Sequence, residues 1–124
     1  RRMIPITGGV VTGPLLNGRI LAGGADYQLL VEDGRHAHLD ARYVLELDDG
    51  SRVFVKNTAL RVASVEDSAR IRHGQPVDPA RVYFRCQPQM EPSSEQWLWL
   101  AEYQFIGVGM RAPDGVFLSF YKVC

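Results

Sequence analysis

The sequence has few of the residues that bind metals or form disulfide frameworks. It contains two cysteines, Cys86 and Cys124, and three histidines among 124 residues. Two cysteines do not make a disulfide framework, and no CxxC spacing of a zinc or redox site is present. His36 and His38 share one strand face, but His73 is the only other histidine and no thiolate cluster accompanies them. We therefore expect no metal, no cofactor and a reducing, cytoplasmic location.

The sequence also lacks an excess of charge and a long apolar run. Fourteen Lys and Arg residues balance fourteen Asp and Glu residues, so no net field favours nucleic acid or an anionic membrane. The apolar stretches, such as residues 105–110, are far shorter than the roughly 18 to 20 residues of a membrane span. No phosphate-binding loop, nucleophile elbow or signal-peptide pattern is present. We expect neither nucleic acid nor membrane as a partner.

What is present indicates strands along nearly the whole chain. Gly23-Gly24, Asp33-Gly34, Asp49-Gly50 and Asp114-Gly115 mark turns between apolar or alternating runs. The clearest predicted hairpin runs from His38 to Glu46 and returns from Arg52 to Val62. Every second residue of its first arm is apolar, which is typical of a strand with one buried face.

A short helix is predicted after this hairpin, where Ser64 and Asp67 have the spacing of a capping box and Gly74 ends the segment near His73. Extended segments follow at 81–90, 97–110 and 116–123, and the last is apolar on both faces. Because closing a sheet removes its edges, we predict one all-β domain over residues 1–124. Its expected fold is a closed or nearly closed antiparallel β-barrel with one short helix. A two-sheet sandwich is the alternative.

The strand from Arg81 to Glu91 has one polar and one apolar face. Tyr83, Arg85 and Glu91 share the polar face, and Phe84 and Met90 lie on the other. The plain interpretation puts the polar face in water. The alternative places Tyr83 and Arg85 inside a polar barrel lumen, and the residue types alone leave both open.

Two further segments carry candidate ligand-binding residues. Asp26 follows the paired glycines Gly23 and Gly24, which allow a sharp turn or close approach to a ligand; it could act as a general base or simply cap a turn. Four aromatic residues lie at odd-numbered positions of the predicted strand and so share one of its faces: Trp97, Trp99, Tyr103 and Phe105. They form either a core stripe or the wall of an apolar pocket.

An ordered set of motifs resembles one uncharacterised family, the DUF-3237 or UPF-0311 group. The motifs are Ile4-Pro5-Ile6-Thr7-Gly8-Gly9, Gly13-Pro14, Gly18, Gly23-Gly24-Ala25-Asp26, Leu39-Asp40-Ala41-Arg42-Tyr43, Asp48-Asp49-Gly50, Tyr83-Phe84-Arg85, Met90-Glu91, Trp99-Leu100 and Phe105-Ile106-Gly107-Val108-Gly109. They span nearly the whole chain. The resemblance implies a compact β-barrel and carries no reaction.

The resemblance also directs attention to particular residues. Asp26, Arg85 and Glu91 are the polar members of its motifs, so we expect them to converge at one site. Tyr27 stands where we expect Trp, and Cys86 stands where Thr is common. Family members usually carry another strand ahead of this region, and the chain begins with Arg1 rather than Met. We therefore expect the natural chain to start upstream.

The favoured function is a cofactor-independent enzyme of the isomerase, hydratase/lyase or cyclase type, acting on a small organic acid or carbonyl compound. Arg85 would hold a carboxylate, Asp26 or Glu91 would move a proton, and Tyr83 would donate a hydrogen bond. Four residues are expected to bind the ligand: Tyr27, Arg42, Trp99 and Tyr103.

Two alternatives to this enzyme stay open, and no motif decides whether the chain is catalytic. The first is a non-catalytic small-molecule binding protein using the same pocket. The second is a homodimer or higher homo-oligomer built on the two-sided apolar strand at 116–123.

Overall fold

The computed structural model describes residues 1–124, and strands dominate it. Nine strands are present: β1 (Arg2–Ile6), β2 (Gly9–Val11), β3 (Gly18–Ile20), β4 (Gly24–Val31), β5 (His36–Leu47), β6 (Arg52–Val62), β7 (Tyr83–Pro92), β8 (Gln104–Ala112) and β9 (Gly115–Val123). One α-helix, α1 (Val65–Arg72), and two 3₁₀ helices, η1 (Pro79–Arg81) and η2 (Glu95–Ala101), complete the fold. The chain is therefore mostly β, as predicted.

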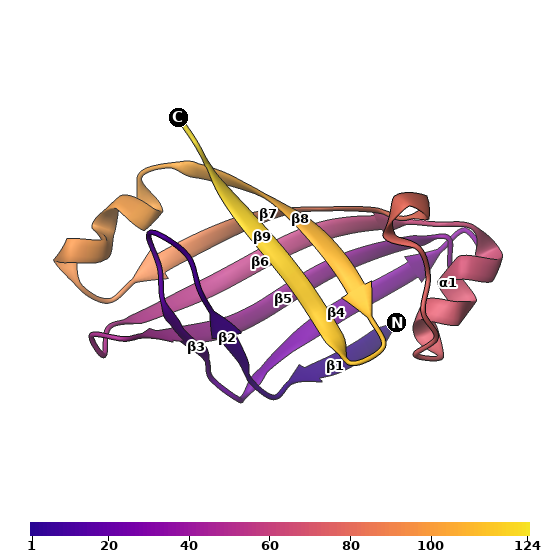
Figure 1. Cartoon of the computed structure of the whole chain (residues 1–124), viewed down its shortest axis with the longest axis horizontal. Coiled ribbons are helices and arrows are strands. Elements are labelled where there is room, and N and C mark those ends of the chain that lie inside the picture. Colours follow the sequence, from indigo (N-terminus) through magenta and orange to yellow (C-terminus); the bar gives the residue numbers. More distant parts are fainter.

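The strands form one antiparallel sheet in the order β1-β4-β5-β6-β7-β8-β9. The sheet curls so that the β8–β9 hairpin lies across the face of β5 and β6 (Figure 1). No hydrogen-bonded ladder joins β9 to β1, so the sheet is strongly curved without closing. The predicted nearly closed antiparallel barrel is confirmed in this form. The prediction of one short helix was incomplete, because η1 and η2 add two 3₁₀ turns.

The β5–β6 hairpin is the centre of the sheet, and it agrees with the prediction. Its ladder pairs His36 with Val62 at one end and Glu46 with Arg52 at the other. Alternate side chains of β5 turn inward, and Leu45 and Leu47 are among the most buried residues of the chain. A slip of one residue would turn this whole apolar set outward, so burial fixes the register.

Along β5 the neighbouring strand changes from β3 to β4, and we call this position the β3–β4 kink. Gly18–Ile20 of β3 pairs with Leu45–Leu47 of β5, whereas β4 pairs with β5 from Arg42 onward. Between them Leu21 donates its backbone N–H to the carbonyl of Val44 at 2.9 Å. A Cβ on Gly24 would lie 2.4 Å from the Arg42 carbonyl oxygen. Only glycine permits this close approach, so this part of the glycine-rich motif has a structural role.

Helix α1 closes one end of the sheet and begins as the capping box predicts. The Ser64 side chain accepts a hydrogen bond from the Asp67 backbone N–H at 3.0 Å. The Asp67 carboxylate is buried and accepts bonds from Arg70 Nη1 at 2.6 Å and from Arg81 Nε at 2.9 Å. These bonds tie the helix to η1, and Gly74, with φ of 72°, follows the C-cap.

We predict that Asp67→Asn lowers the melting temperature at pH 7 by about 5 °C or more. The hydrogen bond from Arg81, with that from Arg70, lowers the pKa of Asp67. A carboxyl group whose pKa is lower in the folded state stabilises the fold above its unfolded pKa. This stabilisation is lost as the pH falls below roughly 4. The variant should therefore show a shallower loss of melting temperature between roughly pH 5 and 3. Asp114→Asn in the β8–β9 turn is the matched control, and equal melting temperatures at pH 7 would contradict the prediction.

One predicted strand is wrong in its first half. The segment 95–101 forms the 3₁₀ helix η2, and β8 begins only at Gln104. Tertiary hydrogen bonds outweigh the strand preference of the aromatic residues here. The Trp97 indole N–H donates to Asp49 Oδ2 at 2.9 Å, and the Ser94 and Ser51 hydroxyls lie 2.9 Å apart. The single aromatic face predicted for this segment therefore does not form.

Two apolar clusters lie on the inner face of the sheet. The larger one fills the end near η2, around Val53, Val55 and Leu100, each at most 1% exposed. The smaller one, formed by Ala37, Leu39 and Phe84, lies toward α1. Figure 1 shows η2, in orange, and α1 at opposite ends of the sheet. No helix of this chain has the length and apolar character needed to cross a membrane.

Candidate functional site

Four polar side chains lie among the apolar residues of the inner face. On β4, Asp26 and Gln28 point inward, and on β6, Asn57 and Arg61 do the same. In the register Ala41 lies between Asp26 and Asn57, and Ala37 lies beside Arg61. All four polar groups are thus on the inner face, where Leu39 lies between Gln28 and Ala59. We call them the inner polar cluster.

Arg61 is the most unusual member of the inner polar cluster. The residue is 4% exposed, yet no hydrogen bond or ion pair of its guanidinium is present. Burial, reinforced by the nearby Arg111 and Arg2, lowers its pKa to about 10, and Asp26 opposes this effect. Arg61 is therefore a cation at neutral pH. A buried cation without a paired anion is costly, and a bound anion would remove that cost.

Three oxygens of the cluster have no hydrogen-bond donor. They are Asp26 Oδ1, Gln28 Oε1 and Asn57 Oδ1, each buried. Asp26 Oδ2, in contrast, accepts a bond from Gln28 Nε2 at 2.9 Å. Buried polar atoms in native proteins are usually paired, and exceptions often mark functional sites. The unused oxygen of Asp26 is a base or acceptor with no partner from the protein.

Cys86 lies next to this cluster and behaves as a core residue, as predicted. It is 2% exposed, and burial raises the pKa of its thiol against an opposing hydrogen bond from Asn57. The thiol is therefore neutral at physiological pH and is not activated as a nucleophile.

The glycines of β8 make room for side chains of β7. A Cβ on Gly107 would lie 2.3 Å from Cys86 Sγ, and one on Gly109 would lie 2.7 Å from the Phe84 ring. These positions need glycine because β7 side chains cover them. The Phe105–Gly109 motif is therefore explained by packing on the inner face.

Apolar side chains on the inner side of β9 remain exposed to water. Val116 and Leu118 point to the inner side by their register with Arg111 and Gly109, yet they are 48% and 37% exposed. The prediction that this strand carries apolar residues on both faces is confirmed, and both faces remain uncovered here.

The structure separates the residues that we expected to converge. Asp26 faces inward, but Tyr83, Arg85 and Glu91 lie on the outer face of β7, and all three are exposed. The Arg85 guanidinium lies 5.4 Å from the centre of the Tyr83 ring on that outer surface. The plain interpretation of this strand is thus confirmed, and the polar lumen built from Tyr83 and Arg85 is wrong. Strand alternation sends Phe84 and Cys86 inward, so their neighbours must point outward.

Two predicted ligand-binding residues meet at a second place. Tyr27 and Arg42 line a groove of about 310 Å³ at the kink between β3 and β4, together with Ala22, Gly23, Gly24, Ala25, Tyr43, Val44 and Phe54. Arg42 also forms an ion pair with Asp40 at 3.2 Å. Because Tyr27 alternates with Asp26, this groove is on the opposite side of β4 from the inner polar cluster.

The other two predicted ligand-binding residues lie near η2. Lys122 Nζ lies 4.5 Å from the centre of the Tyr103 ring and 5.6 Å from that of Trp99. The Trp99 ring also packs against Phe105, with ring centres 6.3 Å apart. The cation of Lys122 thus occupies the face that these rings would offer to a ligand. Trp99 and Tyr103 do not share a site with Asp26 or with Tyr27.

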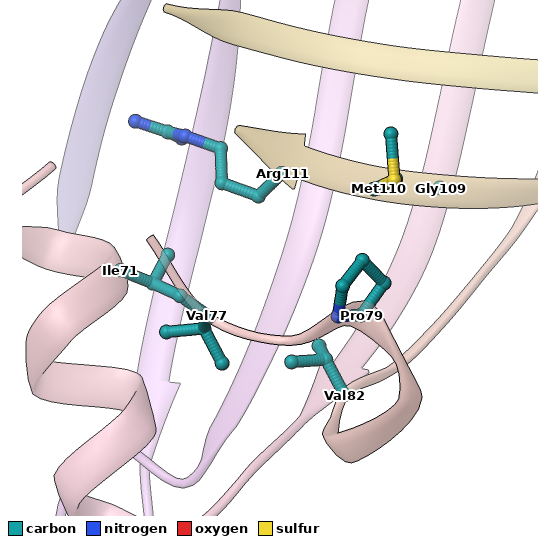
Figure 2. A pocket seen from close by; sticks show the side chains of 7 residues that line it. All are labelled: Ile71, Val77, Pro79, Val82, Gly109, Met110 and Arg111. Carbon is teal, nitrogen blue, oxygen red and sulfur yellow. The ribbon is translucent and has the colours of Figure 1, made fainter. Parts of the chain in front are cut away.

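A very small cavity of about 10 Å³ lies between α1, η1 and β8. Figure 2 shows Ile71, Val77, Pro79 and Val82 around it, with the Arg111 guanidinium pointing away from these apolar side chains. The cavity has room for about one water molecule. The charge of Arg111, one of its lining residues, contributes to lowering the pKa of Arg61. No group of three or more His, Cys, Asp or Glu side chains is arranged to hold a metal ion.

Sequence reasoning missed Gln28, Asn57 and Arg61, although a signal was available for the β6 pair. Along β6 the inward positions read Val53, Val55, Asn57, Ala59 and Arg61. Two polar residues therefore interrupt the series of apolar residues at the inward, alternate positions of a central strand. A polar residue at a position where the period predicts burial is a stronger functional signal than a polar residue on the solvent face.

Comparison with known proteins agrees with this fold. A family model described as a protein of unknown function, DUF3237, matches residues 1–123. The chain belongs to the DUF3237 family. A UPF0311 protein of Rhodopseudomonas palustris is 38% identical over 123 residues, covering 99% of this chain and 80% of that protein. A UPF0311 protein of Clostridium acetobutylicum is 37% identical and is covered to 77%.

Solved structures of similar proteins have the same architecture. A conserved Rhodopseudomonas palustris protein of unknown function superimposes with a TM-score of 0.95 at 38% identity, over 100% of this chain and 83% of that one. An Acinetobacter baumannii protein described as β-barrel-like superimposes with a TM-score of 0.82 at 39% identity, over 98% of this chain and 77% of that one. The resemblance from motifs is thereby confirmed, and family membership assigns no reaction.

Proposed function

We propose that this chain is a cofactor-independent enzyme of the isomerase, hydratase/lyase or cyclase type, acting on a small organic acid or carbonyl compound at the inner polar cluster. The observation that carries the proposal is Arg61, a cation that is 4% exposed and has no ion pair. A carboxylate or enolate oxygen fits the forked N–H donors of a guanidinium. In this site Arg61 takes the role that the sequence suggested for Arg85.

Asp26 supplies the acid–base chemistry in this proposal. Its Oδ1 atom is buried and without a donor, while Oδ2 is held by the Gln28 amide at 2.9 Å. One oxygen is thus oriented by the protein and the other is left for the substrate. Asp26 Oδ1 removes a proton beside the substrate carbonyl and later returns it. Arg61 stabilises the negative charge that forms on the substrate oxygen in between.

A ligand screen followed by product analysis tests the proposal. The purified protein is screened by thermal shift against small organic acids, lactones, enones and aromatic carbonyl compounds. Each stabilising compound is then incubated with the protein and analysed by mass spectrometry. An acid that stabilises the wild type and is converted supports the enzyme, provided that Arg61→Met abolishes the effect. A panel without any Arg61-dependent ligand would contradict the proposal.

The groove at the β3–β4 kink favours a second candidate function, non-catalytic binding. Its volume of about 310 Å³ suits one small molecule, and its lining is mostly apolar with Arg42 at one side. A ligand bound in this groove would be recovered chemically unchanged, and Tyr27→Ala would weaken its binding. Dependence on Tyr27 rather than on Arg61 therefore separates this candidate from the enzyme.

Self-association through β9 stays a prediction. β9 is an edge strand of the sheet. On its outer face, Phe117 and Tyr121 are 55% and 54% exposed. Two copies could pair their β9 strands about a two-fold axis and cover these side chains. We expect sedimentation at micromolar concentration to give a dimer, and Phe117→Lys to give a monomer. A monomeric wild-type protein would count against the prediction.

A further inference from the structure

The inner polar cluster presents more hydrogen-bond acceptors than a simple carboxylic acid would use. Gln28 Oε1 and Asn57 Oδ1 are buried without a donor, and each residue is 3% exposed. Gln28 Nε2 donates to Asp26 Oδ2 at 2.9 Å, which fixes the orientation of the Gln28 amide group. Both oxygens are therefore buried acceptors that the protein leaves without a donor.

The position of these oxygens relative to the cation suggests how they act. Asn57 and Arg61 lie on the same face of β6, four residues apart, with the small side chain of Ala59 between them. Gln28 lies in the same ladder row as Leu39 and Ala59. A molecule whose anionic group meets Arg61 therefore extends past Ala59 toward the two amide oxygens. It must bring O–H or N–H donors there, because oxygen acceptors repel further acceptors.

From this arrangement we infer that the ligand is a hydroxy acid, with its carboxylate on Arg61 and a hydroxyl group donating to Asn57 Oδ1 or Gln28 Oε1. The inference rests on the proposed function, since it assumes that Arg61 binds the acid group. It adds that Asn57 and Gln28 determine specificity. A site built around buried acceptors rejects a molecule that lacks the matching donor, because the acceptor is then left buried and unpaired.

Matched pairs of acids that differ by one hydroxyl group test the inference. The probes are malate against succinate, and 3-phenyllactate against 3-phenylpropionate, measured by isothermal titration calorimetry. We expect the hydroxylated member of at least one pair to bind the wild type about tenfold or more tightly. Asn57→Leu removes the acceptor at similar volume and should reduce that preference to within about threefold. Gln28→Met is the second variant, for the case that Asn57→Leu does not fold. Gln89→Met, on the outer face of β7, is the matched control and should keep the preference.

The outcomes distinguish the inference from the proposal beneath it. Binding that depends on Arg61 but is equal within both pairs would overturn the hydroxyl inference alone. A hydroxyl preference that survives in both Asn57→Leu and Gln28→Met would overturn the assignment of these two residues. If no acid of either pair binds in a way that Arg61→Met abolishes, both the inference and the acid-binding function are overturned.

Discussion

Arg61→Met is expected to abolish acid binding and, at the same time, to stabilise the unliganded protein. Methionine retains most of the apolar stem and fills a similar volume, but it carries no charge. The buried guanidinium has no ion pair, so its desolvation is uncompensated in the free protein. We expect the free energy of unfolding to rise by about 1–3 kcal/mol. We expect the dissociation constant of an acid that stabilises the wild type to rise by roughly a hundredfold or more.

The sign of the stability effect follows from the lowered pKa of Arg61. A cationic group whose pKa is lower in the folded state destabilises the fold as long as it is protonated, and this cost fades as the pH rises above the folded pKa. That pKa is about 10, so the cost is present throughout the physiological range. Thermal unfolding at pH 7 measures the change in stability, and calorimetric titration measures the loss of acid binding.

The matched control for this variant is Arg52→Met. Arg52 lies on the same strand, but its side chain is 63% exposed and forms only a surface ion pair with Glu46. Surface pairs contribute little to stability, so both stability and binding should stay near the wild-type values. Arg85→Met provides a second comparison on the outer face of β7. Loss of binding in Arg85→Met with full binding in Arg61→Met would reverse our assignment of the anion site.

Asp26→Asn is expected to separate catalysis from binding. Asparagine keeps the shape of the side chain and can still accept the hydrogen bond from Gln28, but it cannot exchange a proton at neutral pH. Conversion of any substrate found in the screen should fall roughly 100- to 10,000-fold. The dissociation constant should change much less, since Arg61 retains the acid group. Single-turnover measurements with mass spectrometric detection of product would show the difference.

Asp40→Asn is the control for this second variant. Asp40 lies opposite Tyr27 in the β4–β5 ladder, so it is on the outer side of the sheet, where it pairs with Arg42 at 3.2 Å. Its replacement should leave turnover close to that of the wild type. Full turnover in Asp26→Asn would remove Asp26 as the acid–base residue and would favour the non-catalytic candidate.

The two variants together show how one group of residues can cost stability and provide function. The cluster contains an unpaired buried cation and three buried oxygens without donors. Natural proteins accept such uncompensated groups mainly where a ligand supplies the missing partners. Surrounding it, the ladders of β5 with β4 and β6 are continuous and the apolar clusters lie on either side. The rigid sheet thus holds an arrangement that would not persist on a flexible loop.

The sequence by itself determined the β class, the central hairpin and the capped helix, because these depend on short-range rules. Period-two alternation along β5 follows directly from strand geometry, and Ser64 caps α1 through a hydroxyl three residues from its partner. The inward direction of Phe84 and Cys86 could also be read from alternation in β7.

Only the tertiary structure decided which polar residues share the inner face. Asp26 and Arg61 are thirty-five positions apart, and they lie on the same face because two ladders place β4 and β6 on either side of β5. No local pattern encodes that neighbourhood. The same is true of η2, whose Trp97 indole N–H donates a long-range hydrogen bond to Asp49 and which is helical despite its strand-like composition. Local periodicity thus predicts the face on which a residue lies, whereas long-range strand pairing determines which residues share a site.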